Sequence, residues 1–400
     1  MPHGPASSSV SGSDEALEIQ SSVAMIRRLV GFDTTSRASN LALIHAVRDH
    51  LAAHGVPATL IHNAEGSKAN LVATVGPAVE GGVVLSGHTD VVPVDGQAWD
   101  SDPFTLTERG GRLYGRGTAD MKSFSAIALA LVPEMVAAGL KRPIHLALSY
   151  DEEVGCLGAP SIIAEMARTV PTPAAVIIGE PTGMKVVGTH KGIRVYQVDI
   201  TGLESHSAHA DRAVSAVMTA AELIHWLGER ARERAAAPVP GSLFDPPYST
   251  ITAEVIKGGT AHNIISKACS FVWSVRDVPE DDTDALEAAF HAQADAMQAA
   301  MRRIAPETGI RIARLANVPA FRREADSDAD RLVRRLTGDN TTGAVSFAAE
   351  AGQFQQAGYS TIMCGPGFID QAHQPNEFIA IDQVRAGASF LRGLIAHLSA

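Results

Sequence analysis

The chain has 400 residues, 46% of them hydrophobic, which is enough for a large core and more than one domain. Its 44 acidic residues outnumber 33 Lys and Arg and give a formal charge of -11. No cluster of Lys and Arg offsets this charge, so a nucleic-acid-binding surface is excluded. Residues 1–15 lack the basic and apolar segments of a secretory signal and are predicted to be a flexible tail. No apolar run approaches the roughly 20 residues that cross a bilayer, so no membrane partner is expected.

Three dispersed cysteines, Cys156, Cys269 and Cys364, form no even-numbered framework for disulfides. An odd, scattered set is typical of a reducing compartment. We therefore expect a cytoplasmic protein, in which Cys156 is a small buried hydrophobe.

Along the first half of the chain, short apolar runs typical of buried strands end in acidic or histidine residues. The run 82–86 is followed by His88 and Asp90, and the run 174–178 by Glu180. The run 144–150 is followed by Asp151, Glu152 and Glu153. His88 and Asp90 point the same way if the strand geometry continues, because side chains alternate with a period of two. A carboxylate beside a histidine can fix the orientation of its ring.

Three adjacent acids more often form a solvated charge run than a site. Asp151-Glu152-Glu153, however, follows a buried-type strand and precedes the turn residue Gly155. Acids in that position are poorly explained by solvation alone. We therefore expect them to contribute to a site.

Two further candidates lie in glycine-rich loops. Asp120 follows Gly117 and precedes a helical segment, 124–132, so a role as helix N-cap is an even alternative to metal binding. His373 lies in the turn-rich segment 365–375, after the strand-like run 361–364.

The candidate ligands are histidines and carboxylates without cysteine, which is the donor set of a hydrolytic divalent-metal site. In an open α/β sheet, ligands bind outside the carboxyl ends of the strands, so these distant segments can converge. One ion needs about three protein ligands, and five or six therefore indicate two ions that share a bridge.

From about residue 191 the pattern changes to the order β-α-β-β-α-β, which is typical of a ferredoxin-like fold. The expected elements are strands 194–200, 250–256, 270–275 and 310–315 and helices 214–234 and 283–304. None of the acid-bearing turns lies here. The sequence predicts an α/β catalytic domain of residues 1–190 and 317–400, with residues 191–316 inserted as a lid or dimerisation domain.

Together these motifs resemble, in order from about Met25 to the C-terminus, the dinuclear-zinc deacylases and exopeptidases, a family that includes acetylornithine deacetylase, succinyl-diaminopimelate desuccinylase, carboxypeptidase G and the aminoacylases. The resemblance implies two divalent ions, most commonly Zn²⁺, with Co²⁺ as an alternative. It assigns His88, Asp120 and Glu180 to one ion, and Asp120, Glu153 and His373 to the other. Asp120 would be the bridge, Asp90 would orient His88, and Glu152 would be the general base.

In the inserted domain, the resemblance assigns an oxyanion-binding histidine, supplied by the partner subunit in dimeric members, to His206 in Gly202-Leu-Glu-Ser-His-Ser207. An ordinary loop histidine is the alternative, and His209 is a competitor. Asn263 and Arg276 match substrate-binding positions, and Arg276 could instead form a surface ion pair with Asp277 or Glu280. Ala210 and Ser266 depart from the family, where proline is common.

The segments 346–352 and 365–377 are most similar to acetylornithine deacetylase, which implies deacetylation of N-acetyl-L-ornithine in arginine biosynthesis. Glu350 is predicted to bind the substrate's side-chain ammonium, with capping of the following helix as its alternative. A broader N-acyl-amino-acid hydrolase, a succinyl-diaminopimelate desuccinylase or a dipeptidase-like exopeptidase would use the same metal ions. A non-catalytic binding protein is disfavoured because such a protein needs no base at Glu152. We expect a homodimer formed through the inserted domain.

Overall fold

The computed structural model describes residues 12–400, with side chains described from residue 19 onward. Residues 1–11 of the predicted tail lie outside this range, and helix α1 (Gly12–Val30) begins within the predicted tail of residues 1–15. The described chain separates into two compact units. The first contains the residues up to Gly188, Glu324–Thr342 and Phe354–Ala400, and the second contains Thr189–Arg323 and Gly343–Gln353. Gly343–Gln353 was expected in the catalytic domain.

The first unit is built on a mixed sheet whose strands follow the order β1-β2-β6-β3-β7-β16-β8. These strands are β1 (Ala58–His62), β2 (Ala69–Val75), β3 (Val83–His88), β6 (Ile144–Ser149), β7 (Ala175–Ile178), β16 (Thr361–Met363) and β8 (Val187–His190), of which β8 is divided between the two units. Strand β15 (Gly343–Val345) belongs to the second unit. The neighbours β6, β3, β7 and β16 are mutually parallel. Their carboxyl ends therefore share one edge of the sheet.

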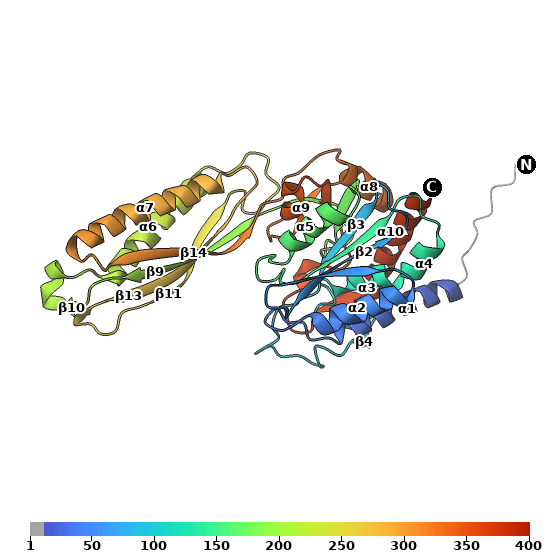
Figure 1. Cartoon of the computed structure of the whole chain (residues 1–400), viewed down its shortest axis with the longest axis horizontal. Coiled ribbons are helices and arrows are strands. Elements are labelled where there is room, and N and C mark those ends of the chain that lie inside the picture. The colour runs from blue at the N-terminus through green and yellow to red at the C-terminus, as the bar shows by residue number, and fades with distance from the viewer. Residues whose placement is uncertain (1–11) are drawn as a thin grey trace, which may run out of the picture. The chain divides into compact units, whose positions relative to one another are not determined.

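Helices flank this sheet in the first unit (Figure 1). They are α2 (Leu41–Ala53), α3 (Lys122–Ala130), α4 (Val132–Ala137), α5 (Ala159–Thr169), α8 (Asp328–Thr337), α9 (Ala351–Gln356, divided between the two units) and α10 (Ile381–Ser399). All residues of β3, β6 and β7 are buried, as expected for parallel strands covered on both faces. A small sheet of β4 (Thr107–Arg109), β5 (Arg112–Tyr114) and β17 (Phe378–Ala380) brings the chain before α3 close to the chain after His373.

The second unit contains the β-α-β-β-α-β order expected from the sequence. Its elements are β9 (Ile193–Thr201), α6 (Ala216–Ala236), β11 (Thr250–Gly258), β13 (Ala268–Arg276), α7 (Thr283–Ile304) and β14 (Gly309–Val318). The antiparallel sheet has the order β11-β13-β9-β14. Alternate residues of β13 are buried, and Trp273 stacks on its cross-strand partner Tyr196 with ring centroids 4.4 Å apart.

Short elements complete the described fold: β10 (Ser205–His206), the 3-10 helix η1 (Ser207–Arg212), β12 (Ile264–Ile265) and the 3-10 helix η2 (Ile369–Gln371). Among the described helices, none combines the length and hydropathy needed to span a bilayer.

Candidate metal centre

The shared carboxyl edge of the parallel strands brings the predicted ligands together within the first unit. His88 is the last residue of β3, Glu180 follows β7, and Glu153 follows β6. Asp120 comes from the loop before α3, and His373 from the loop after β16. Two overlapping groups result, one of His88, Asp120 and Glu180 and the other of Asp120, Glu153 and His373, each with its donor atoms within 4.8 Å of one another. Their role as ligands stays a prediction.

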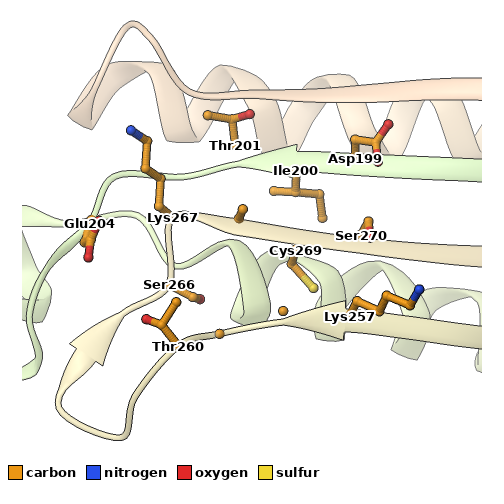
Figure 2. Close-up of a pocket in the computed structure, with 13 residues that line it drawn as sticks. Asp199, Ile200, Thr201, Glu204, Lys257, Thr260, Ser266, Lys267, Cys269 and Ser270 are labelled. Atoms are coloured by element: carbon orange, nitrogen blue, oxygen red, sulfur yellow. The ribbon is translucent and has the colours of Figure 1, made fainter.

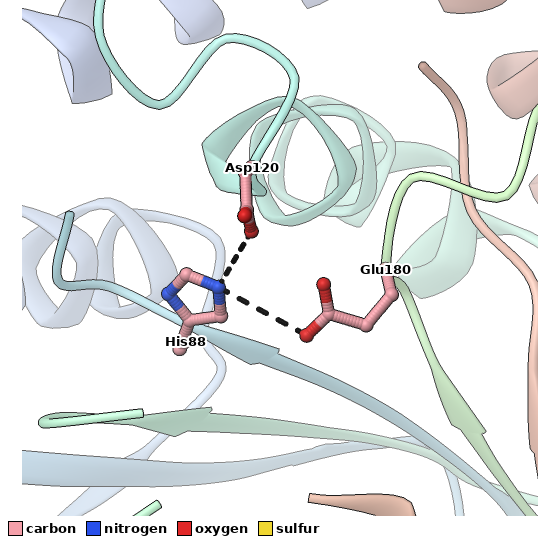
Figure 3. A group of neighbouring side chains, drawn as sticks. All are labelled: His88, Asp120 and Glu180. Atoms are coloured by element: carbon pink, nitrogen blue, oxygen red, sulfur yellow. Dashed lines mark hydrogen bonds and ion pairs between the residues drawn. The ribbon is translucent and has the colours of Figure 1, made fainter. Parts of the chain in front are cut away.

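The first group is almost completely buried, and Figure 3 shows its three side chains pointing toward one another. The Nε2 atom of His88 lies 2.9 Å from Oδ1 of Asp120 and 4.0 Å from Oε1 of Glu180. The donors therefore converge from three separate segments on one small volume. This spacing suits a divalent ion, which would draw each donor to about 2.0–2.2 Å.

The second group uses the other oxygen of Asp120. The Nε2 atom of His373 lies 3.2 Å from Oδ2 of Asp120 and 3.0 Å from Oε2 of Glu153. The side chain of His373 is half exposed, whereas that of Glu153 is 6% exposed. Asp120 thus faces both histidines, which is the arrangement required of a bridging carboxylate.

Glycine at position 179 allows this convergence. A Cβ atom there would lie 2.0 Å from the ring of Phe124 in helix α3. The end of β7, which carries Glu180, can therefore approach α3 only without a side chain at this position.

Two alternatives from the sequence are wrong. The N-cap of α3 is Met121, with no side-chain cap hydrogen bond, so Asp120 is not the cap. The peptide Asp120–Met121 is cis. Asp151-Glu152-Glu153 is not a solvated run, because Asp151 forms a 2.5 Å ion pair with Lys68 and Glu153 faces His373.

Asp90 orients His88 through a different atom from the one expected. The Nδ1–H of His88 donates to the backbone carbonyl of Asp90 at 2.9 Å, while the carboxylate lies 3.6 Å away. This bond leaves Nε2 free to act as a ligand. The Asp90 carboxylate instead accepts the backbone N–H groups of Glu152 at 3.1 Å and Glu153 at 3.3 Å. Asp90 therefore fixes the turn that carries the predicted base.

Glu152 belongs to neither ligand group among the described residues, which keeps it available for proton transfer. The thiol of Cys156 donates to its Oε1 at 3.4 Å. Burial and the charges of Glu180, Glu153 and Asp120 raise the pKa of Glu152 well above its usual range, although His88 opposes the shift. A raised pKa is what a carboxylate needs to accept a proton near neutral pH.

The charges of the site fit divalent cations. Four carboxylates, from Asp120, Glu152, Glu153 and Glu180, surround only two histidines. Burial raises the pKa of Glu153 to about 7, and the Asp120 charge adds to this. Hydrogen bonds to Asp120 and Glu153 raise the pKa of His373 to about 10. Burial opposes protonation of His88, but the hydrogen bond and charge of Asp120 raise its pKa well above normal. Bound cations would relieve the same excess of negative charge.

Sequence reasoning missed three residues that hold the ligand loops. Glu377, 1% exposed, accepts the backbone N–H groups of Ala119 at 2.8 Å and Asp120 at 3.1 Å through Oε1. Arg116, also 1% exposed, donates to Oε2 of Glu377 at 2.7 Å and to Gln97 at 2.6 Å. One feature of the sequence could have indicated Glu377 and Arg116, since both are charged and lie four residues from a predicted ligand, His373 and Asp120 respectively.

The remaining predicted residues lie in the second unit. His206 and Asn263 are both exposed and lie close together, because Ser207 N–H donates to the carbonyl of Asn263 at 2.9 Å and β10 pairs with β12. Arg276 ends β13, whereas Asn263 comes before the first residue of that strand, Ala268, and the strand itself is roughly 25 Å long. One copy of the second unit therefore does not bring Asn263 and Arg276 together. Within residues 19–400, Arg276 has no ion pair to Asp277 or Glu280.

Glu350 is buried and directly precedes helix α9. It belongs to the second unit, whereas all the predicted ligands belong to the first. Its predicted contact with substrate therefore stays a prediction.

A cavity of about 540 Å³ in the second unit is lined by β9, β11 and β13 (Figure 2). It includes Gly258, Gly259 and Thr260, which begin the predicted substrate-binding segment 258–263. Lys257 and Lys267 also line it, but no predicted ligand does. The cavity is therefore distinct from the ligand groups.

Comparison with known proteins identifies the family of this constellation. Residues 84–397 match the model of peptidase family M20/M25/M40. The chain belongs to this family. The match confirms the family expected from the sequence and makes the chain an enzyme of the M20 metallopeptidase and amidohydrolase class.

Two relatives cover nearly the whole chain. The chain is 34% identical to acetylornithine deacetylase of Myxococcus xanthus, over 94% of this chain and 96% of that protein. It is 33% identical to acetylornithine deacetylase of Pasteurella multocida, over 89% of this chain and 91% of the relative.

Solved structures share the fold. A tripeptidase from Staphylococcus aureus superposes with a TM-score of 0.72 at 17% identity, over 95% of this chain and 98% of the other. A dinuclear metal-binding M20 peptidase from Bacillus subtilis gives 0.62 at 14% identity, over 96% and 98%. The predicted α/β fold class is thereby confirmed.

Metal binding should release protons. In the metal-free chain at pH 7, His373 is protonated because its pKa is raised to about 10, and an ion must displace that proton. The apparent affinity should therefore rise with pH between 7 and 9, by about tenfold per pH unit for each proton released. Calorimetric titration with Zn²⁺ in two buffers of different ionisation enthalpy counts these protons. His373→Gln should release about one fewer, and equal counts in both proteins would contradict the expectation.

Proposed function

We propose that this enzyme removes the acetyl group from N-acetyl-L-ornithine, giving acetate and L-ornithine, as a cytoplasmic step of arginine biosynthesis. The main observation in its support is that the two candidate ligand groups share Asp120, whereas the neighbouring Glu152 belongs to neither group. Full-length relatives named acetylornithine deacetylase support this substrate over others.

Two divalent ions, Zn²⁺ or alternatively Co²⁺, fit the histidine and carboxylate donors of the two groups. His88, Asp120 and Glu180 would hold one, and Asp120, Glu153 and His373 the other. Such ions polarise a carbonyl and lower the pKa of water from about 15.7 toward about 7.

Glu152 moves the proton in this proposal. It takes one proton from the attacking water as the oxygen adds to the acetyl carbon. It then donates that proton to the ornithine nitrogen as the C–N bond breaks, so that acetic acid and the amine are released, and transfer of the acid's remaining proton to the amine gives acetate and the ammonium form of ornithine. The raised pKa of Glu152 suits both halves of this cycle.

His206 would stabilise the oxyanion formed during this attack. Its Nδ1 accepts the backbone N–H of Ala208 at 3.1 Å, which places the ring proton of neutral His206 on Nε2. That Nε2–H is an available donor. Arg276 and Asn263 would bind the substrate carboxylate and amide, since the guanidinium offers a forked, permanently charged donor.

A homodimer through the second unit is part of the proposal. Strand β11 lies at the edge of its sheet and exposes Val255 and Ile256, 46% and 56% accessible. Exposed apolar edge strands favour pairing with another chain. Light scattering should give the molar mass of two chains, and Ile256→Lys should lower it toward that of one. A monomeric wild-type chain would contradict the proposal.

A panel of N-acyl amino acids tests the function. The Zn²⁺-loaded enzyme should hydrolyse N-acetyl-L-ornithine with the highest kcat/KM among acetylornithine, acetylmethionine, succinyl-diaminopimelate and dipeptides. Glu152→Gln should lower kcat by roughly 100- to 10,000-fold while retaining its metal ions, because amide cannot accept the proton. Preference for acetylmethionine would favour a broader acylase, and preference for the succinylated substrate a desuccinylase.

Glu350 carries the proposed preference for ornithine. If its carboxylate binds the side-chain ammonium, Glu350→Gln should lower kcat/KM on acetylornithine about 10- to 100-fold while acetylmethionine changes little. Equal losses on both substrates would instead support a structural role at the start of α9.

A further inference from the structure

Two loops that are distant in sequence meet at the second ligand group, and each needs its backbone fixed. Asp120 lies before α3, and His373 lies in an exposed loop with a left-handed backbone, φ 61°. A non-glycine residue holds that conformation only where surrounding contacts determine it. The residues that make these backbone contacts therefore determine the geometry of the Asp120, Glu153 and His373 group.

Gln97 holds the His373 loop. Its Nε2 donates to the backbone carbonyl of His373 at 3.0 Å. Its Oε1 accepts from Arg116 at 2.6 Å and from the indole N–H of Trp99 at 3.1 Å. Two donors facing Oε1 fix which way the amide points, so that its N–H group is directed to His373.

Glu377 holds the Asp120 loop in the same manner. Its Oε1 accepts the N–H groups of Ala119 and Asp120, and its Oε2 accepts from Arg116. Without the carboxylate, both buried N–H groups would lose this acceptor, which would destabilise the position of the loop.

Arg116 connects Glu377 and Gln97 through its rigid guanidinium group. One terminal nitrogen binds Glu377 and the other binds Gln97. The planar guanidinium fixes the separation of these nitrogens, which a single lysine ammonium cannot do. Its position over the Trp99 ring, 5.2 Å from the centroid, restrains it further.

Burial of this charged pair is not explained by stability, because a buried ion pair is often no better than apolar residues of the same volume. Glu377 also adds a carboxylate next to Asp120, and burial and that neighbour raise its pKa. The arrangement is better explained by the geometry it imposes on Asp120 and His373.

We propose that Arg116, through Glu377 and Gln97, positions Asp120 and His373 relative to each other and so sets the affinity of the Asp120, Glu153 and His373 group for its metal ion. The inference rests on the proposed ligand roles. The group of His88, Asp120 and Glu180 lacks His373 and should be much less sensitive to Gln97, which contacts only the His373 loop.

Gln97→Glu and Arg116→Lys test the inference. Gln97→Glu keeps an acceptor for Arg116 but replaces the donor to His373 with a carboxylate, at a half-buried position. Arg116→Lys keeps the charge and loses the fork. Each metal-free variant is titrated with Co²⁺, following visible absorption and calorimetry. The second ion should bind 10- to 100-fold more weakly in Gln97→Glu, while the first changes less than about threefold. Arg116→Lys also disturbs the support of Asp120, which belongs to both groups, so it should weaken both ions.

Gln374→Glu is the matched control. Its Nε2 also donates to a backbone carbonyl, that of Asp370 at 2.9 Å, in the same loop and next to His373, but it makes no link to Arg116. It should bind two ions as the wild type does. Wild-type affinity for both ions in Gln97→Glu, or equal weakening of both ions in that variant, would overturn the inference alone. A wild-type chain that binds fewer than two ions would overturn the proposed metal centre with it.

Discussion

The carboxylate of Asp120 is the group on which the rest of the site depends. It faces His88 with one oxygen, at 2.9 Å, and His373 with the other, at 3.2 Å. Both contacts require the loop before α3 to hold a single position. The backbone N–H of Asp120 is fixed by Glu377, so the loop is determined from outside the ligand groups. A shift of this one carboxylate would alter both groups at once.

Concentrated negative charge is the second constraint. Buried carboxylates repel one another, and each is held by a specific contact rather than by solvent. Asp90 accepts the N–H groups of the turn carrying Glu152 and Glu153, and Lys68 pairs with Asp151 at that turn's start. Bound cations would offset this concentration of negative charge, which is why the site suits a metal centre.

The fold class and the convergence of the candidate ligands could be predicted from the sequence because both follow local rules. Apolar runs of strand length end at His88 and before Glu153 and Glu180, and parallel strands bring their carboxyl ends to one edge. The carbonyl of Asp90 as the partner of His88 could not be predicted, because the choice between carbonyl and carboxylate depends on backbone direction after β3. Arg116 and Glu377 were missed because their pairing spans 261 residues and has no periodicity.

The residues proposed to choose the substrate follow different rules from the residues proposed to hold metal. His206, Asn263, Arg276 and Glu350 lie in the second unit, outside the strand edge that gathers the ligands. Asn263 precedes β13 and Arg276 ends it, in an antiparallel sheet, so no parallel-strand rule brings them together. Their positions depend on turns and on assembly rather than on sheet topology. The candidate metal ligands thus follow from one edge of the sheet. The positions of the residues proposed to bind substrate depend instead on contacts beyond that sheet.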